Sequence, residues 1–426
     1  MYECRFSFAA QHALAPDAAP LRFAAQVKRR PLGHFRVEMS PSPQPSITQL
    51  FTSFLRLGIT AFGGPSMVAY IRKMAVEEKR WLDAETFSDG VALCQMIPGA
   101  TAMQMSAYVG LKTRGVIGAG ASFIGFGLPA FLLMMAFATL YTYAHTLPIV
   151  VSAFNGLQAI IVAIIANATL SFGKTTLKDW KTLVIAGIAA VLFGLNVNPV
   201  LVILLAAVGG FAAIKSKQPN PHPAVSSVQT MAYTKPLMLI LSVSAIGFLL
   251  LFFFNQTLFN LAILLFRIDL LAFGGGFASV PLMLHEIVGV RNWIDNQTFM
   301  NGIILGQVTP GPIVITATFI GYLLGGPFGG VVATISIFLP SFMVVVGISP
   351  YFDRLRASPA FNKVIGGVLC SFVGLLLTVT IRFALNVHWD LSHLLLASSA
   401  LVALLLKVDI LWVVVIGTII SVMVST

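Results

Sequence analysis

Two stretches far apart in the chain read almost alike: FLRLGITAFGGPS at residues 54–66 and LFRIDLLAFGGGF at residues 265–277. Aligning them places Arg56 on Arg267, a shift of 211 residues (267 − 56 = 211). A single match of this kind can arise by chance between apolar helices. The fold therefore depends on whether the same shift continues along the chain.

The shift does continue, in the same order and with nearly the same spacing. The further matches are Trp81-Leu82-Asp83 with Trp293-Ile294-Asp295, Gln95-x-x-Pro98-Gly99 with Gln307-x-x-Pro310-Gly311, and Pro129 with Pro340. They predict an internal repeat, with a first copy at 47–217, a linker at 218–258 and a second copy at 259–426. Residues 1–46 are basic, then rich in Ser and Pro, and are expected to form a disordered tail.

Composition places the chain in a membrane. Hydrophobic residues make up 57% of it and charged residues 10%, whereas about a quarter of residues are charged in soluble proteins. The mean hydropathy is +0.90. Four stretches contain no Asp, Glu, Lys or Arg and exceed the roughly 20 residues of a membrane-spanning helix: 115–173, 182–214, 236–266 and 296–352. They lack the alternation of a membrane β-barrel, so we predict an all-α polytopic membrane protein.

Apolar runs between charges and Pro or Gly breaks predict about thirteen spans, six in each repeat and one in the linker. The four that contain the repeated motifs are 50–71, 88–111, 260–284 and 298–323. Seven spans precede the second repeat, which must then enter from the opposite face, as in the inverted repeats of many secondary transporters. Because Lys and Arg near span ends favour the cytoplasm, we expect a cytoplasmic N-terminus. The basic loop 72–85 disagrees with this count, and a re-entrant first segment is the alternative.

Several classes of function are not indicated. The net charge of +11 is carried by residues between spans, so it does not predict nucleic-acid binding. The three cysteines, Cys4, Cys94 and Cys370, have no metal-ligand spacing, so neither a metal site nor another cofactor is predicted. The sequence contains no nucleotide-binding or hydrolase motif, so an enzyme is not predicted.

Arg56 and Arg267 lie inside apolar segments, where a charge costs at least about 2.5 kcal/mol and usually marks a transport path or a partner. A guanidinium offers a planar fork of donors that suits two oxygens of an oxyanion. We therefore expect the two arginines to face one central anion site. Alternatively, each extends to the membrane surface and binds nothing.

Glycine and proline interrupt both repeats where a helix interior is expected. Such breaks expose backbone N–H groups at the start of the next helix, which attract anions. Gln95 and Gln307 precede the Pro-Gly breaks and are candidate donors to a substrate oxygen. Alternatively, the glycines allow close packing and the amides bond a neighbouring helix. The candidate substrate-binding residues are Arg56, Phe62, Gly63, Gly64, Gln95, Pro98, Gly99, Arg267, Phe273, Gly274, Gly275, Gln307, Pro310 and Gly311.

Asp269 differs from these residues because its partner position in the first repeat is Gly58. An acidic group deep in an apolar segment is a candidate for coupling transport to an ion gradient by protonation. The alternative is that Asp269 is a counter-ion for Arg267 or for another base.

The duplicated FGGP/FGGG, W-[LI]-D and Q-x-x-PG elements resemble those of the chromate transporter family in its long two-domain form. The resemblance covers about residues 50–426. It implies a transporter of the bacterial inner membrane that exports chromate, driven by an ion gradient, commonly of protons, and that confers chromate resistance. Sulfate is a related oxyanion substrate in this resemblance.

The sequence departs from the family pattern in three places: FGGG in the second repeat, PGP after Gln307, and the long basic tail. Three alternatives are left open: a transporter of sulfate or another inorganic anion, a passive anion channel, or a membrane scaffold whose breaks only pack. Lipid is the expected environment, and a homo-oligomer is compatible with the sequence.

Overall fold

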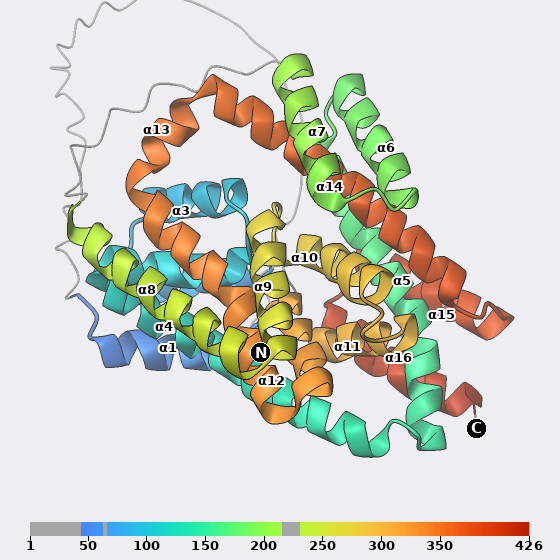
Figure 1. Cartoon of the computed structure of the whole chain (residues 1–426). Coiled ribbons are helices and arrows are strands. Elements are labelled where there is room, and N and C mark those ends of the chain that lie inside the picture. The colour runs from blue at the N-terminus through green and yellow to red at the C-terminus, as the bar shows by residue number, and fades with distance from the viewer. Residues whose placement is uncertain (1–43, 63–65, 215–230, 426) are drawn as a thin grey trace, which may run out of the picture. The chain divides into compact units, whose positions relative to one another are not determined.

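The computed structural model describes residues 44–62, 66–214 and 231–425, and every regular element in these ranges is a helix (Figure 1). The prediction of an all-α fold is confirmed. The tail predicted at 1–46 lies outside the described residues except for its last three positions, and Gly63 and Gly64 also lie outside them.

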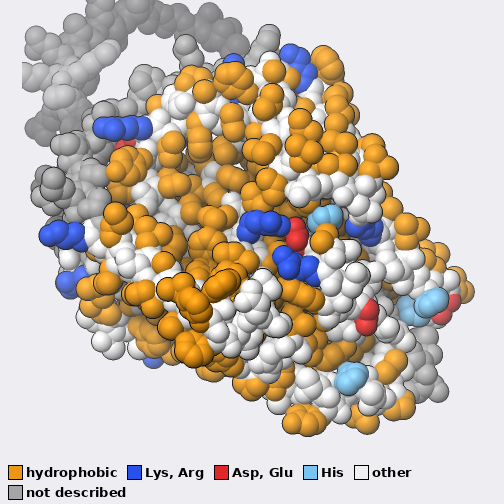
Figure 2. Space-filling model, viewed as in Figure 1, with side chains coloured by type: hydrophobic (Ala, Val, Ile, Leu, Met, Phe, Trp, Pro, Cys, Tyr) orange, Lys and Arg blue, Asp and Glu red, His pale blue; other side chains and the backbone are white. Residues whose placement is uncertain are grey.

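Within the described ranges, five helices are long and apolar enough to cross a membrane. They are α4 (Thr101–Ala144), α5 (Pro148–Thr176), α8 (Met231–Phe254), α12 (Thr316–Ile348) and α14 (Pro359–Asn386). Shorter apolar helices accompany them: α6 (Trp180–Gly194), α7 (Pro199–Ala213), α15 (Leu391–Leu405) and α16 (Ile410–Ser425). Hydrophobic side chains cover most of the face in Figure 2, as expected of a surface in contact with lipid.

Helix α4 is two helices joined by a sharp reversal. The backbone leaves the helical region at Arg114 and at Gly115, which has a φ of 64° that only glycine adopts without strain. Beyond the reversal the chain folds back on itself, because the Ser122 hydroxyl donates to the carbonyl of Ser106 at 2.7 Å. We call residues 114–115 the first turn. It separates a short arm of α4 from a long arm.

Helix α12 has the same construction in the second repeat. Its backbone reverses at Gly325 and Gly326, where φ of Gly326 is 62°. The hydroxyls of Thr318 and Thr334 then lie 2.7 Å apart on its two arms. We call residues 325–326 the second turn.

The segments before α4 also double back. They form α1 (Ile47–Thr60), α2 (Ser66–Arg72), the π-helix η1 (Lys73–Glu78) and α3 (Ala84–Met96). Arg114 donates from Nε to the carbonyl of Pro45 at 2.6 Å, which places the start of α1 at the first turn. Tyr108 donates to the carbonyl of Thr86 at 3.2 Å, which places the start of α3 at the same end. The predicted spans 50–71 and 88–111 are therefore each a hairpin of short helices, the first interrupted between Thr60 and Ser66 and the second at Pro98-Gly99.

The second repeat builds the same hairpins from α9 (Gln256–Leu271), α10 (Gly276–Met283), the π-helix η2 (Leu284–Val290), α11 (Asn296–Val308) and the short η3 (Ile313–Ile315). Gly302 faces the ring of Phe319, just as Gly90 faces the ring of Tyr108. The predicted spans 260–284 and 298–323 are thus also hairpins. Two small elements, η4 (Ser349–Tyr351) and α13 (Phe352–Ala357), join α12 to α14.

The two repeats point in opposite directions. The long arm of α4 begins at the first turn, and near its other end the Thr139 hydroxyl lies 2.9 Å from that of Tyr322, beside the second turn. Met135 likewise contacts Gly330, just after the second turn. The two turns therefore lie at opposite ends of one long helix, as the predicted inversion requires.

The helices form two groups, which Figure 1 shows on different sides of the view. The first group is built on α4 and α12, with Phe123 of α4 against Phe338 and Phe342 of α12. Helix α1 packs on α4, α9 packs on α12, and α8 contacts α9, α12 and α4. The second group consists of α5, α6, α7, α14, α15 and α16. In that group Gly367 of α14 lies against the backbone of α7 at Gly210. Helices α2, α3, α10 and α11, which belong to the hairpins, lie between the two groups and position the candidate site.

Candidate anion site

Each of the two Pro-Gly breaks forms a backbone hydrogen bond with the other repeat. The N–H of Gly99 donates to the carbonyl of Ala272 at 2.9 Å, and the N–H of Gly311 donates to the carbonyl of Ala61 at 3.0 Å. Both glycines have a positive φ, 121° and 113°, so other residues would be strained there. The breaks thus have a structural role, the reversal of the chain at the contact between repeats.

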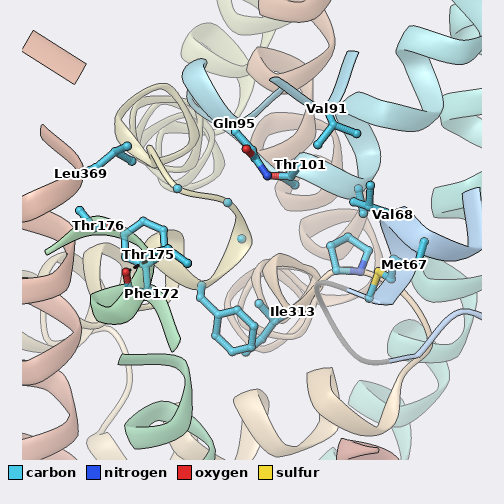
Figure 3. Close-up of a pocket in the computed structure, with 18 of the residues that line it drawn as sticks. Met67, Val68, Val91, Gln95, Thr101, Phe172, Thr175, Thr176, Ile313 and Leu369 are labelled. Atoms are coloured by element: carbon cyan, nitrogen blue, oxygen red, sulfur yellow. Dashed lines mark hydrogen bonds between the residues drawn. The ribbon is translucent and has the colours of Figure 1, made fainter. Parts of the chain in front are cut away.

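A cavity of about 1400 Å³ lies beside these breaks (Figure 3). Its walls come from α2 and α3, the start of α4, the end of α5 and the following loop, the start of α10, and part of α14. The cavity therefore lies between the two groups of helices. Inverted-repeat transporters bind their substrates at this kind of location.

Uncharged donors line the inner part of the cavity. Gln95 is exposed on its wall, and Figure 3 shows it beside Thr101, the first residue of α4. Gln307 contributes a buried Nε2 that has no hydrogen-bond partner among the described residues. The hydroxyl of Thr309 already donates to the carbonyl of Leu305 at 2.7 Å, so its proton is not free for a substrate.

Two helix N-termini add backbone N–H groups to this donor set. Helix α10 begins after Gly275, which has a φ of 95° and provides no side-chain cap. Helix α4 begins after Ala100, which also provides no side-chain cap. The uncapped end of a helix carries partial positive charge and attracts anions. The lining thus combines amide, hydroxyl and backbone donors, which suits an oxyanion.

Charged residues line only the outer part of the cavity. Arg72 of α2 and Lys178 of the loop after α5 are exposed there, close to Asp179. The carboxylate of Asp179 caps α6 by accepting from the Thr182 N–H at 2.9 Å, and these bonds hold its pKa below the usual range. Ala84, at the start of α3, also lines this part, so the mouth lies at the first-turn end.

The structure brings together some of the residues predicted from sequence. Those that line the cavity are Gln95, Gly274, Gly275, Gln307 and Gly311. Those outside the lining are Phe62, Pro98, Gly99, Phe273 and Pro310, which form or flank the breaks. Sequence reasoning missed Thr101, Arg72 and Lys178. The position of Thr101, two residues after Gly99 of the Pro-Gly break, was the available signal.

Arg56 and Arg267, expected to face one central anion site, do not line this cavity. Both side chains are exposed. Arg267 forms an ion pair with Glu286 of η2, which is also 3.9 Å from Arg291. The physical reason is packing: Gly58 on the opposite face of α1 lies against the backbone of α4, which turns Arg56 outward.

Asp269 is fully buried behind the cavity lining. Its Oδ2 accepts from the N–H of Ser341 at 2.8 Å and from the Ser341 hydroxyl at 2.7 Å. Because Arg267 pairs with Glu286, Asp269 is not its counter-ion.

Comparison with known proteins agrees with this architecture. The model of the chromate transporter family matches residues 48–211 and again 259–422. An uncharacterized transporter of Methanocaldococcus jannaschii is 42% identical over 393 residues, covering 91% of this chain and 96% of its own. The chromate transport proteins of Pseudomonas aeruginosa and Cupriavidus metallidurans are each 30% identical, covering 82% and 86% of this chain and 83% and 89% of their own. No solved structure matches the chain.

Proposed function

Because the chain belongs to the chromate transporter family, we propose that it is a secondary transporter that binds chromate in the central cavity and exports it across the cell's inner membrane. The observation that carries this proposal is the cavity itself, enclosed between inverted repeats and lined by Gln95, Thr101, Gln307 and uncapped helix ends. Export would confer resistance to chromate.

The lining favours reversible binding of a tetrahedral dianion. Chromate presents oxygen acceptors in all directions, and amides, hydroxyls and backbone N–H groups donate to them without a fixed positive charge. A transported ion must bind well enough to enter and weakly enough to leave. Arg72 and Lys178 outnumber Asp179 at the mouth, and the resulting net positive charge raises the local anion concentration.

We place the N-terminus in the cytoplasm, and the hairpins strengthen the argument from basic residues. With hairpins in place of spans, the basic loop 72–85 joins the first-turn end, where Arg114 and Lys178 also lie. Arg382, which donates to Asn196 at the far end of α6, remains at the other end, and Arg291, which directly follows η2, joins it there. The mouth of the cavity then faces the cytoplasm, which is the side from which an exporter loads.

We further propose that a proton gradient drives export and that Asp269 is the proton site. Its Oδ1 is buried and has no hydrogen-bond partner among the described residues, so a proton can be added there without breaking a bond. Helices α10 and α12, which pack on α9, carry no acidic or basic side chain. Helix α8 carries only Lys235, which is exposed. Glu286 of η2 also contacts α9, but it is held in an ion pair with Arg267 and lies 3.9 Å from Arg291. Asp269 has no such ion pair among the described residues, so we assign the proton to it.

Everted membrane vesicles provide the test. They should accumulate labelled chromate when the vesicle interior is more acidic than the medium, and collapse of this proton gradient should abolish accumulation. Excess sulfate should compete if the site accepts both oxyanions. Uptake that only equilibrates chromate and ignores the gradient would show a passive channel instead.

A further inference from the structure

Asp269 is connected to the cavity wall through one side chain, that of Ser341 in α12. The Ser341 hydroxyl donates to Asp269 Oδ2 at 2.7 Å and accepts from the N–H of Ala100 at 2.9 Å. Ala100 directly precedes Thr101, which lines the cavity at the start of α4. A chain of two hydrogen bonds thus runs from the buried carboxylate to the N-terminus of a cavity-lining helix.

The symmetry-related position, where the roles of the two repeats are exchanged, lacks every member of this chain. The residues that correspond to Asp269, Ser341 and Ala100 are Gly58, Ala130 and Pro312, which provide no carboxylate, no hydroxyl and no N–H, respectively. The correspondence is structural as well as sequential. Gly99 faces the side chain of Ser341, and Gly311 faces that of Ala130 in the same way.

The polar chain is not needed for the two breaks to pack. The symmetry-related position makes the same reciprocal backbone bond, from Gly311 N–H to the carbonyl of Ala61, without the polar chain. Packing of the breaks therefore does not require Asp269 or Ser341. A buried carboxylate is costly in a membrane unless it serves a function.

We propose that Ser341 is a positioning residue that couples the charge of Asp269 to the anion cavity, an inference that rests on the function proposed above. While Asp269 is ionised, the Ser341 hydroxyl donates to it and its oxygen accepts from Ala100. A proton added at the free Oδ1 neutralises Asp269, so the bond that its Oδ2 accepts from the Ser341 hydroxyl loses its charge assistance. The serine oxygen then accepts more weakly from the N–H of Ala100, the start of α4 shifts, and chromate is released. Proton and anion therefore exclude each other, as export against an inward proton gradient requires.

The test compares chromate binding by the purified full-length protein from mildly acidic to mildly alkaline pH. Labelled chromate is the probe, and its own protonation is common to all variants. Wild type should lose affinity as the pH falls. Ser341→Ala, which copies Ala130 of the first repeat, should still bind chromate at alkaline pH but with a pH dependence reduced at least severalfold. Ala130→Ser is the matched control and should keep the wild-type dependence.

Each outcome decides a different claim. A wild-type slope in Ser341→Ala overturns the relay. If Asp269→Asn flattens the profile while Ser341→Ala does not, proton coupling stands and the relay is wrong. A wild-type affinity that rises as the pH falls contradicts mutual exclusion. Absence of chromate binding by wild type at every pH overturns the proposed function and, with it, the relay.

Discussion

Gln158 of α5 donates from Nε2 to Oδ1 of Asn301 in α11 at 3.1 Å, and both side chains are buried. Asn301 in turn donates to the hydroxyl of Tyr141 at 3.1 Å. By the repeat, Asn301 corresponds to Asp89, whose carboxylate instead forms a 2.8 Å ion pair with Arg356. The amide pair thus joins α11 to the second group of helices at the end of the molecule away from the mouth.

Loss of this amide pair should favour opening of the molecule at the end away from the mouth. Asn301→Ala removes two hydrogen bonds, of which the one with Gln158 joins α11 to the second group. Its typical net value of about 1 kcal/mol corresponds to about a fivefold change in the equilibrium between closed and open states. A cysteine introduced at Ile304, now buried, should then react faster with a membrane-impermeant thiol reagent applied from that side. The background needs Cys4, Cys94 and Cys370 replaced.

Thr139→Ala is the control for this experiment, because the Thr139–Tyr322 hydrogen bond lies within the first group of helices. It should leave the labelling rate at position 304 unchanged. Equal acceleration in both variants would mean that the amide pair is not a specific seal.

The hairpins predict which loops share a side of the membrane. Cysteines placed at Glu85 and Lys174 should react with an impermeant reagent from the same side, and a cysteine at Val290 from the opposite side. Thirteen full spans would instead put residue 85 opposite residue 174. Labelling of intact cells and of everted vesicles distinguishes the two arrangements.

The basic mouth should control the rate of anion entry. Arg72→Gln combined with Lys178→Gln should slow initial chromate uptake severalfold at low ionic strength, and the deficit should shrink as salt screens the charges. Arg354→Gln is the control, because Arg354 is exposed but does not line the cavity. A deficit that is insensitive to salt would indicate lost structure rather than lost attraction.

Gly99 should tolerate no side chain. A Cβ there would lie 2.2 Å from the Ser341 oxygen, on a backbone with a φ of 121°. We expect Gly99→Ala to destabilise the protein by several kcal/mol, from backbone strain and from overpacking. Gly120→Ala in α4 should be harmless, because a Cβ at Gly120 would meet no atom within 4 Å. Thermal unfolding in detergent measures both variants.

The sequence predicted the repeat and its inversion because short anchors such as W-[LI]-D carry register locally. It did not predict the hairpins, because hydropathy measures apolar length and cannot show that the chain reverses at Gly115 or Gly326. That Arg56 and Arg267 lie outside the cavity was missed for a related reason. A charge in an apolar helix suggests a buried site, but which face of α1 carries Arg56 depends on how Gly58 packs against α4.

Gln95 and Gln307 were found because an amide before a Pro-Gly break is visible in sequence. Arg72 and Lys178 were missed as a pair because they are adjacent only after α2 and the end of α5 fold to one mouth. Asp269 was recognised by its asymmetry, but its partner Ser341, 72 residues away, became evident only in the folded structure.

The most direct measurement compares chromate binding by two variants, Gln307→Leu and Arg56→Gln, with that of wild type, by equilibrium dialysis of the purified protein. If the cavity holds the anion, Gln307→Leu loses a hydrogen bond to a charged group, worth about 1.5–3 kcal/mol, and its affinity should fall at least about tenfold. Arg56→Gln should bind as wild type does. Normal binding by Gln307→Leu together with lost binding by Arg56→Gln would contradict the cavity and restore the arginine site.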